Sequence, residues 1–315
     1  MKLTSAPFAL LLVSLLLQPL LAEDEKKEEQ EKKEPVVSIF PDKNLEEVVR
    51  RNVFAKRDND EPLTAADVEK ISTIEGKAKG IRDLRGLEHC RSLALIDLED
   101  NDIADIDPIM DLKKLQSINL AKNRIGDLTA LAKLERIQYL HLADNRISDL
   151  EPLRNLKNTR SLYLSNNKIK DLQPIAELDK IWSLYVDGNR LESLKSISKL
   201  KWLSSLDLRG NGISDLAPLS ALTELKYLVI ESNKIKDLSV LLEMAKKDAD
   251  GEQRFAPFWR LYVADNPLSE SASGQLEEIV KLGGRVQNES IVPKPKAADE
   301  NKDGDSGEET AKKAA

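Results

Sequence analysis

Side chains that commonly carry catalysis or bind metals are scarce in this chain. Histidine occurs only at His89 and His141, and cysteine only at Cys90, among 315 residues. No HExxH, CxxC or GxSxG motif and no glycine-rich phosphate loop is present. A single histidine on a binding surface is more often a contact residue than a general base. The sequence therefore predicts no enzyme, no metal centre and no cofactor.

One segment resembles half of a calcium-binding loop. Residues 299–304 read DENKDG, which matches the start of such a loop. The match then ends, because Ser306 replaces an apolar residue and Thr310 replaces the bidentate glutamate. Residues 23–34 and 291–315 carry charges of both signs without apolar periodicity. These compositions predict a flexible linker and a disordered tail.

An asparagine recurs at a fixed interval through most of the chain. Apolar residues lie eight, five and three positions before it and two positions after it. Around Asn145 they are Ile137, Leu140, Leu142 and Ile147. This frame matches the leucine-rich repeat pattern LxxLxLxxNxL. Successive asparagines lie 22 residues apart, and the last follows after 33: Asn101, Asn123, Asn145, Asn167, Asn189, Asn211, Asn233 and Asn266.

Each recurring position has a structural explanation. The LxL pair alternates with a period of two, which predicts a short strand with both leucines facing a core. The asparagine can bond backbone groups of its own turn and the next, and each such group left unpaired would cost about 1–3 kcal/mol. The aspartate of the following DLxPL segment is expected to cap a tight turn. We therefore assign no binding role to these residues. Cys90 falls at a leucine position and is expected to be buried and inert.

The positions that change between repeats are the candidates for binding. They flank the central leucine of each strand, so their side chains should point to the concave face of an arc of stacked repeats. All five tyrosines fall at these positions, and Trp182 and Trp259 are expected at the edge of the same face. The predicted ligand-binding residues are Tyr139, His141, Tyr163, Trp182, Tyr185, Asp187, Asp207, Arg209, Tyr227 and Tyr262.

Two interpretations of these aromatic residues are open. Exposed tyrosine and tryptophan in a contiguous patch commonly mark a recognition surface, because they give large contact area with a polar group attached. Aromatic residues also favour strands whatever their function. We favour recognition.

The N-terminus has the pattern of a cleaved secretory signal. Lys2 precedes an apolar run at residues 8–17, and Ala22 is the expected last residue of the signal peptide, 1–22. The run is short for a membrane span. We therefore expect the mature protein to have no membrane span and to be secreted or periplasmic.

The repeats are predicted to lie between two caps. Residues 35–70 should form a helical N-terminal cap, with Thr64 starting its second helix. The repeats occupy 71–268, beginning with a degenerate copy that has Lys79 in place of the asparagine. Residues 269–290 should form a C-terminal cap, a helix followed by an edge. The insertion at 248–257 predicts a lengthened convex helix and a loop, which we assign to this cap rather than to a binding element.

The segments FPDKNLEEVV, LTAADVEKI and GIRDLRGLEHC, followed by copies of NxIxDLxPL, resemble bacterial internalin-type leucine-rich-repeat proteins over residues 35–268. The repeat is also similar to that of a eukaryotic phosphatase regulatory subunit. The internalin resemblance implies an exported recognition protein with helical caps. We find no wall-sorting signal, immunoglobulin-like domain or basic wall-binding module, so host-cell invasion is not expected.

Together these features predict an α/β solenoid: a leucine-rich-repeat arc with short parallel strands on its concave face, a helical N-terminal cap and a C-terminal capping helix. We expect an exported, non-enzymatic binding protein whose ligand is a protein, with an envelope glycan as the second candidate. The formal net charge of −7 argues against nucleic acid. The alternative function is a scaffold of the cell envelope that acts through its convex face or its tails.

Overall fold

The computed structural model describes residues 37–289. The chain divides into two units, residues 1–36 and 37–315, and the described residues all belong to the second. The predicted signal peptide, the linker and the calcium-loop-like segment at 299–304 lie outside the described residues. Within residues 37–289, no helix is long and apolar enough to cross a membrane.

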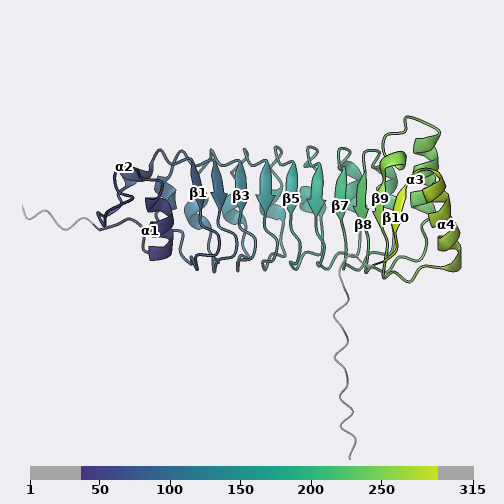
Figure 1. Cartoon of the computed structure of the whole chain (residues 1–315), viewed down its shortest axis with the longest axis horizontal. Coiled ribbons are helices and arrows are strands. Elements are labelled where there is room, and N and C mark those ends of the chain that lie inside the picture. The colour runs from purple at the N-terminus through teal and green to yellow at the C-terminus, as the bar shows by residue number, and fades with distance from the viewer. Residues whose placement is uncertain (1–36, 290–315) are drawn as a thin grey trace, which may run out of the picture. The chain divides into compact units, whose positions relative to one another are not determined.

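Ten parallel strands form one sheet in which neighbours in space are neighbours in the chain (Figure 1). Each strand has three residues, so every repeat contributes one short strand to the sheet. The strands are β1 (Thr73–Glu75), β2 (Leu95–Asp97), β3 (Ser117–Asn119), β4 (Tyr139–His141), β5 (Ser161–Tyr163), β6 (Ser183–Tyr185), β7 (Ser205–Asp207), β8 (Tyr227–Val229), β9 (Arg260–Tyr262) and β10 (Arg285–Gln287).

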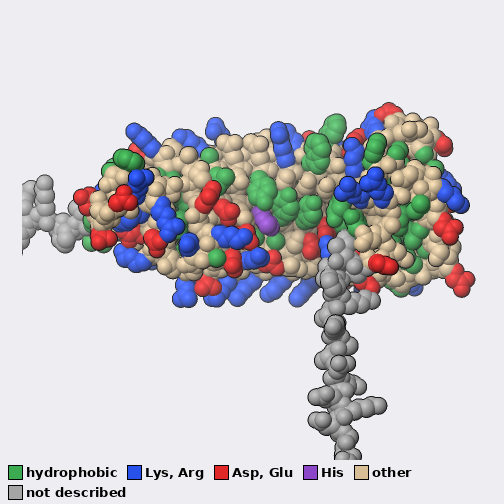
Figure 2. Space-filling model, in the orientation of Figure 1, with side chains coloured by type: hydrophobic (Ala, Val, Ile, Leu, Met, Phe, Trp, Pro, Cys, Tyr) green, Lys and Arg blue, Asp and Glu red, His purple; other side chains and the backbone are tan. Residues whose placement is uncertain are grey.

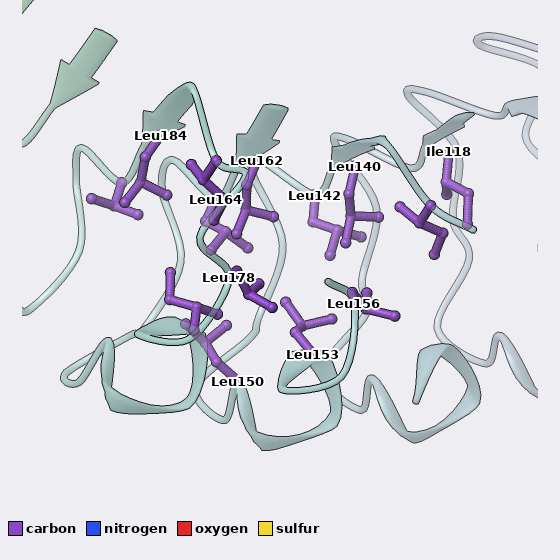
Figure 3. Packing of buried hydrophobic residues seen from close by; sticks show 14 of the residues in the cluster. Ile118, Leu140, Leu142, Leu150, Leu153, Leu156, Leu162, Leu164, Leu178 and Leu184 are labelled. Atoms are coloured by element: carbon purple, nitrogen blue, oxygen red, sulfur yellow. The ribbon is translucent and has the colours of Figure 1, made fainter. Parts of the chain in front are cut away.

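The core is a single aliphatic layer that runs through all the repeats. The central residue of each strand points inward, and equivalent residues pair across the sheet, as Leu140 does with Leu162. Figure 3 shows these leucines between the strands and the helical turns on the other side, where Leu153 and Leu156 close the same layer. Cys90 is buried in this cluster, as predicted from its position, and burial raises the pKa of its thiol to about 12.

The return segments are short 3-10 helices, and most of them begin with a side-chain cap. Asp149 accepts a hydrogen bond from the backbone N–H of Glu151 at 2.8 Å, and Pro152 occupies the first turn. This confirms the capping role expected for the DLxPL aspartate. The 3-10 helices are η1 (Leu87–His89), η2 (Asp107–Ile109), η3 (Thr129–Leu131), η4 (Glu151–Leu153), η5 (Gln173–Ile175), η6 (Lys195–Lys199), η7 (Ala217–Ala221) and η8 (Ala256–Phe258).

The asparagine ladder ties each repeat to the one before it. Asn167 Nδ2 donates to the carbonyl oxygens of Leu142, at 3.0 Å, and of Leu164, also at 3.0 Å. Its Oδ1 accepts the backbone N–H of Ile147 at 2.9 Å. The same pattern recurs from Asn101 to Asn266. The asparagines are therefore structural, as predicted.

Two helices cover the N-terminal end of the array. Helix α1 (Lys43–Arg50) starts at Asp42, whose carboxylate accepts the N–H groups of residues 44 and 45. Helix α2 (Ala65–Val68) starts at Thr64, whose N–H and hydroxyl both bond to Asp67 at 2.7 Å. Phe40 is buried against Gly86, where a Cβ would lie 2.5 Å from the ring.

The C-terminal end is closed by helix α3 (Ser239–Ala249), helix α4 (Glu270–Lys281) and strand β10. The inserted residues extend α3 and then form a loop held by Asp248, which accepts N–H bonds from Arg254, Phe255 and Ala256 at 2.8–3.1 Å. Our prediction for Trp259 was wrong. Its side chain is 0% exposed and packs edge-on against Phe255, because the insertion shifts the frame and tryptophan takes over a core position.

Candidate functional site

The concave face consists of the strand residues that flank each buried central residue, on the side of the sheet opposite the 3-10 helices. Pairing across the sheet aligns these residues in two rows. One row brings His141 next to Tyr163 and Tyr163 next to Tyr185. Figure 2, in which tyrosine is coloured as hydrophobic, shows such side chains gathered around a histidine over the middle strands.

Four aromatic side chains on β4, β5 and β6 form one continuous cluster. The Tyr163 ring stacks on Tyr185 with centroids 4.9 Å apart and planes 15° apart. On its other side it contacts His141 at 4.9 Å and Tyr139 at 5.4 Å. All four side chains are half-buried. We call Tyr139, His141, Tyr163 and Tyr185 the aromatic ladder.

Partial burial favours the uncharged forms of three members of the aromatic ladder, Tyr139, His141 and Tyr185. It lowers the pKa of His141, which favours the neutral imidazole. It also raises the pKa values of Tyr139 and Tyr185, so these phenols keep their protons. Tyr139 Oη and His141 Nδ1 lie 3.5 Å apart. The surface offers flat rings with hydroxyl and imidazole groups for hydrogen bonding.

The charged residues predicted beside the ladder are engaged with one another. Asp207 is 3% exposed and its Oδ2 lies 2.7 Å from Arg209 Nη2. Arg209 Nε lies 3.8 Å from a carboxylate oxygen of Glu231, which is fully buried. Burial raises the pKa of Asp207, and the hydrogen bonds from Arg209 partly oppose this rise. The geometry gives Asp207 and Arg209 a structural role in the sheet.

Two further tyrosines form a separate cluster near the C-terminal end. Tyr227 and Tyr262 lie 5.4 Å apart between centroids. Val229, which is buried, and Asp207 stand between them and the aromatic ladder in the second row. Tyr227 and Tyr262 therefore contact each other rather than the rings of the aromatic ladder. Asp187 lies on the same side of the sheet, where it accepts a hydrogen bond from Ser165.

Trp182 lies at the edge of the sheet rather than within the ladder. It directly precedes β6 and is 62% exposed. Trp202, which sequence reasoning missed, is 65% exposed and lies three residues before β7. The repeat register could have identified this residue. Trp202 occupies the same repeat position as Asn158 and Lys180, and both of these polar residues are exposed.

The two histidines and the acidic side chains of the described residues do not come together at this surface. Among residues 37–289, no three His, Cys, Asp or Glu side chains come together in a way that could hold a metal ion. His89, the second histidine, is on the other side of the molecule's core in η1, so it cannot pair with His141. What the aromatic ladder does offer is a set of rings that are fixed by contact with one another.

Family models place the repeats in a known class. A model described as leucine-rich repeats in two copies matches residues 135–177 and 201–243, and a leucine-rich-repeat model matches 91–147. No curated protein matches the chain significantly. The sheet, the asparagine ladder and these matches define a leucine-rich-repeat solenoid.

A solved structure identifies the type of leucine-rich-repeat protein to which the chain is similar. An internalin C2 from Listeria monocytogenes is 30% identical, with a TM-score of 0.62, over 65% of this chain and 91% of its own. The chain belongs to the internalin-type leucine-rich-repeat proteins.

Two more distant structures share only the fold. A Leptospira interrogans leucine-rich-repeat protein is 20% identical with a TM-score of 0.51, over 64% of this chain and 56% of its own. The Arabidopsis thaliana receptor kinase ectodomain GASSHO1/SCHENGEN3, solved with Casparian strip integrity factor 2, is 23% identical with a TM-score of 0.50. That match spans 58% of this chain and 22% of the other.

Proposed function

We propose that this chain is an exported, non-enzymatic binding protein that recognises a protein ligand through its concave face. The aromatic ladder is the observation that carries the proposal. Stacked repeats create extended binding surfaces of this kind. Tyrosine is also enriched where proteins bind proteins, because it presents large area with little side-chain entropy to lose.

The structure supports a site centred on Tyr163. This ring contacts the three other members of the ladder. Its position is therefore set before any ligand arrives, and pre-organisation of this kind raises affinity. Export is supported by the signal-like segment at residues 1–22 and by the family. The same segment supports a periplasmic or extracellular location.

The test is a pull-down from the native cell envelope with the wild-type protein and a Tyr163→Ala, Tyr185→Ala variant. Circular dichroism first establishes that both are folded. A matched control is Lys133→Ala, Lys195→Ala, which alters exposed residues away from the concave face. A protein retained by the wild type and the control but lost by the tyrosine variant supports the proposal. Identical partners for all three proteins would assign binding to the convex face or the tails instead.

A further inference from the structure

A groove runs along the edge of the sheet where the strands begin. It encloses about 340 Å³ and lies outside the concave face, because its residues precede the strands rather than belonging to them. We call it the edge groove. Its lining residues are Gln116, Arg136, Gln138, Asn158, Arg160 and Lys180.

The repeat architecture arranges these residues in two parallel rows. In the first row, backbone hydrogen bonds of 2.8 Å join Gln138 to Gln116, Arg160 to Gln138 and Trp182 to Arg160. In the second row, Lys180 Nζ donates to Asn158 Oδ1 at 2.8 Å. Neighbouring strands in a sheet are about 4.8 Å apart. The groove thus repeats its polar groups at a spacing close to the length of one sugar unit in a linear chain.

The edge groove is positively charged, and both of its arginines are available. Its lining contains three cationic and three amide side chains but no carboxylate. Among the described residues, the guanidinium groups of Arg136 and Arg160 take part in no hydrogen bond or ion pair. Glu135 and Asp179 are exposed next to it in sequence but do not line it. Guanidinium groups without a partner can bind carboxylate, sulfate or phosphate through bidentate hydrogen bonds.

In each row, the next repeat position is occupied by an exposed tryptophan. Trp182 follows Arg160 in the first row, and Trp202 follows Lys180 in the second. Both indoles are largely exposed to solvent. Figure 2 shows hydrophobic side chains rising at this edge over β6 and β7, next to Lys and Arg side chains.

From this arrangement we propose that the edge groove binds a linear anionic oligosaccharide, separately from the ligand of the concave face. The arginines and Lys180 bind acidic groups on the sugar. The amides of Gln116 and Gln138 donate to and accept from its hydroxyls. Asn158 instead positions Lys180, because its Oδ1 accepts from Lys180 and its Nδ2 donates to the carbonyl oxygen of Glu135. Trp182 and Trp202 stack on the apolar faces of the sugar rings at one end.

Single-stranded nucleic acid fits this groove less well. A groove for nucleic acid places aromatic platforms along its length, so that successive bases can stack. Here the two indoles lie together at one end, and the rest of the groove is lined by amides and cations. The amides are suited to the hydroxyl groups that a sugar presents in every unit.

The binding experiment uses the full chain and isothermal titration calorimetry. The probe is an oligogalacturonate of six units, and the comparison ligands are maltohexaose, polyphosphate and oligo(dT). Binding of the oligogalacturonate alone, weakened by added salt, is the expected result. No binding, or equal binding of polyphosphate or oligo(dT), would overturn the proposal in favour of an inert or a merely cationic surface.

Variants assign the binding to the edge groove. Arg136→Gln, Arg160→Gln should weaken oligogalacturonate binding at least about tenfold, because charge-assisted hydrogen bonds are lost. The variant Trp182→Ala, Trp202→Ala should weaken it by a similar factor. The charge-matched control is Arg146→Gln, Arg190→Gln, which alters exposed residues at the opposite edge of the sheet. An equal loss in this control would contradict the proposal.

One further variant separates the two sites. Tyr163→Ala, Tyr185→Ala removes the centre of the aromatic ladder but leaves every residue of the edge groove in place. It should bind the oligogalacturonate with unchanged affinity. Loss of binding in this variant would move the oligosaccharide to the concave face. Failure of the protein pull-down leaves this result unaffected, so the two proposals can fail independently.

Discussion

Arg209, which the sequence predicted as a ligand contact, is held by two carboxylates in the structure. Its guanidinium lies between Asp207, at 2.7 Å, and the buried Glu231, at 3.8 Å. A nearby cation offsets part of the cost of burying these two carboxylates. Removing one partner of such a group is costly, since the charges left behind remain away from water.

We predict that Arg209→Met lowers the free energy of unfolding by about 3 kcal/mol at pH 8. The loss should shrink towards pH 5. The pKa of Asp207 is already raised by burial, and without Arg209 it rises further, so the carboxyl gains a proton as the pH falls and the penalty disappears. Urea unfolding at the two pH values measures the difference.

Arg154→Met is the matched control, because Arg154 pairs with Glu151 on the exposed side of η4. It should change stability by less than about 1 kcal/mol at either pH. If Arg209→Met were equally mild, Asp207 and Arg209 would again be candidates for ligand contacts.

Glu99 makes a second residue-scale prediction with the opposite pH dependence. Lys77 lies 2.9 Å and Lys122 3.1 Å from its carboxylate, in the repeats before and after it. The hydrogen bond from Lys77 is the main cause that lowers the pKa of Glu99 to about 2. This interaction is fully present above the ordinary value of 4.5 and is lost as the pH falls towards 2.

Glu99→Gln should therefore cost about 1 kcal/mol at pH 7, a value limited by solvent around the lysines. The cost should shrink steadily as the pH falls from 4.5 towards 2. Thermal unfolding followed by circular dichroism across this range gives the difference. Glu75→Gln, at an exposed position on β1, should have no such pH-dependent effect. A pH-independent loss for Glu99→Gln would show that packing rather than charge is responsible.

At the scale of elements, the periodic features could be predicted from sequence and the local pairings could not. The strands, the capped turns and the burial of Cys90 follow from one frame of apolar positions that recurs every 22 residues. Trp259 escaped prediction because the insertion breaks that frame just before it. The frame also indicates the face to which Asp207 points, but not that its side chain is buried there.

The asparagine ladder gives the element-scale prediction. Asn167→Ala removes bonds to Leu142, Leu164 and Ile147, which belong to two consecutive repeats. Leaving these buried backbone groups unpaired should lower the free energy of unfolding by about 3 kcal/mol. Chemical denaturation measures the loss. Asn155→Ala, at an exposed position after η4, should be nearly neutral, and equal effects of the two variants would contradict a ladder that joins repeats.

At the scale of the whole molecule, the core is one cluster that extends from Phe40 in the N-terminal cap to Ile279 in α4. Each repeat contacts only its neighbours, yet the buried leucine layer has no break between them. Strong coupling between neighbouring units makes an array unfold as one unit. The chain provides a test of this coupling, because its three tryptophans include Trp259, which is buried near the C-terminal end.

Phe40→Ala is predicted to destabilise the array as a whole, by about 3–4 kcal/mol, because it opens a cavity beside Gly86. In a background with Trp182→Phe and Trp202→Phe, fluorescence reports on Trp259 alone. If the ends are coupled, the fluorescence and far-ultraviolet circular dichroism transitions shift together to lower urea. A fluorescence transition that stays where it is, while circular dichroism shifts, would show that the N-terminal cap unfolds separately. Coincident shifts would mean that the aromatic ladder and the edge groove are held in place by both ends of the molecule.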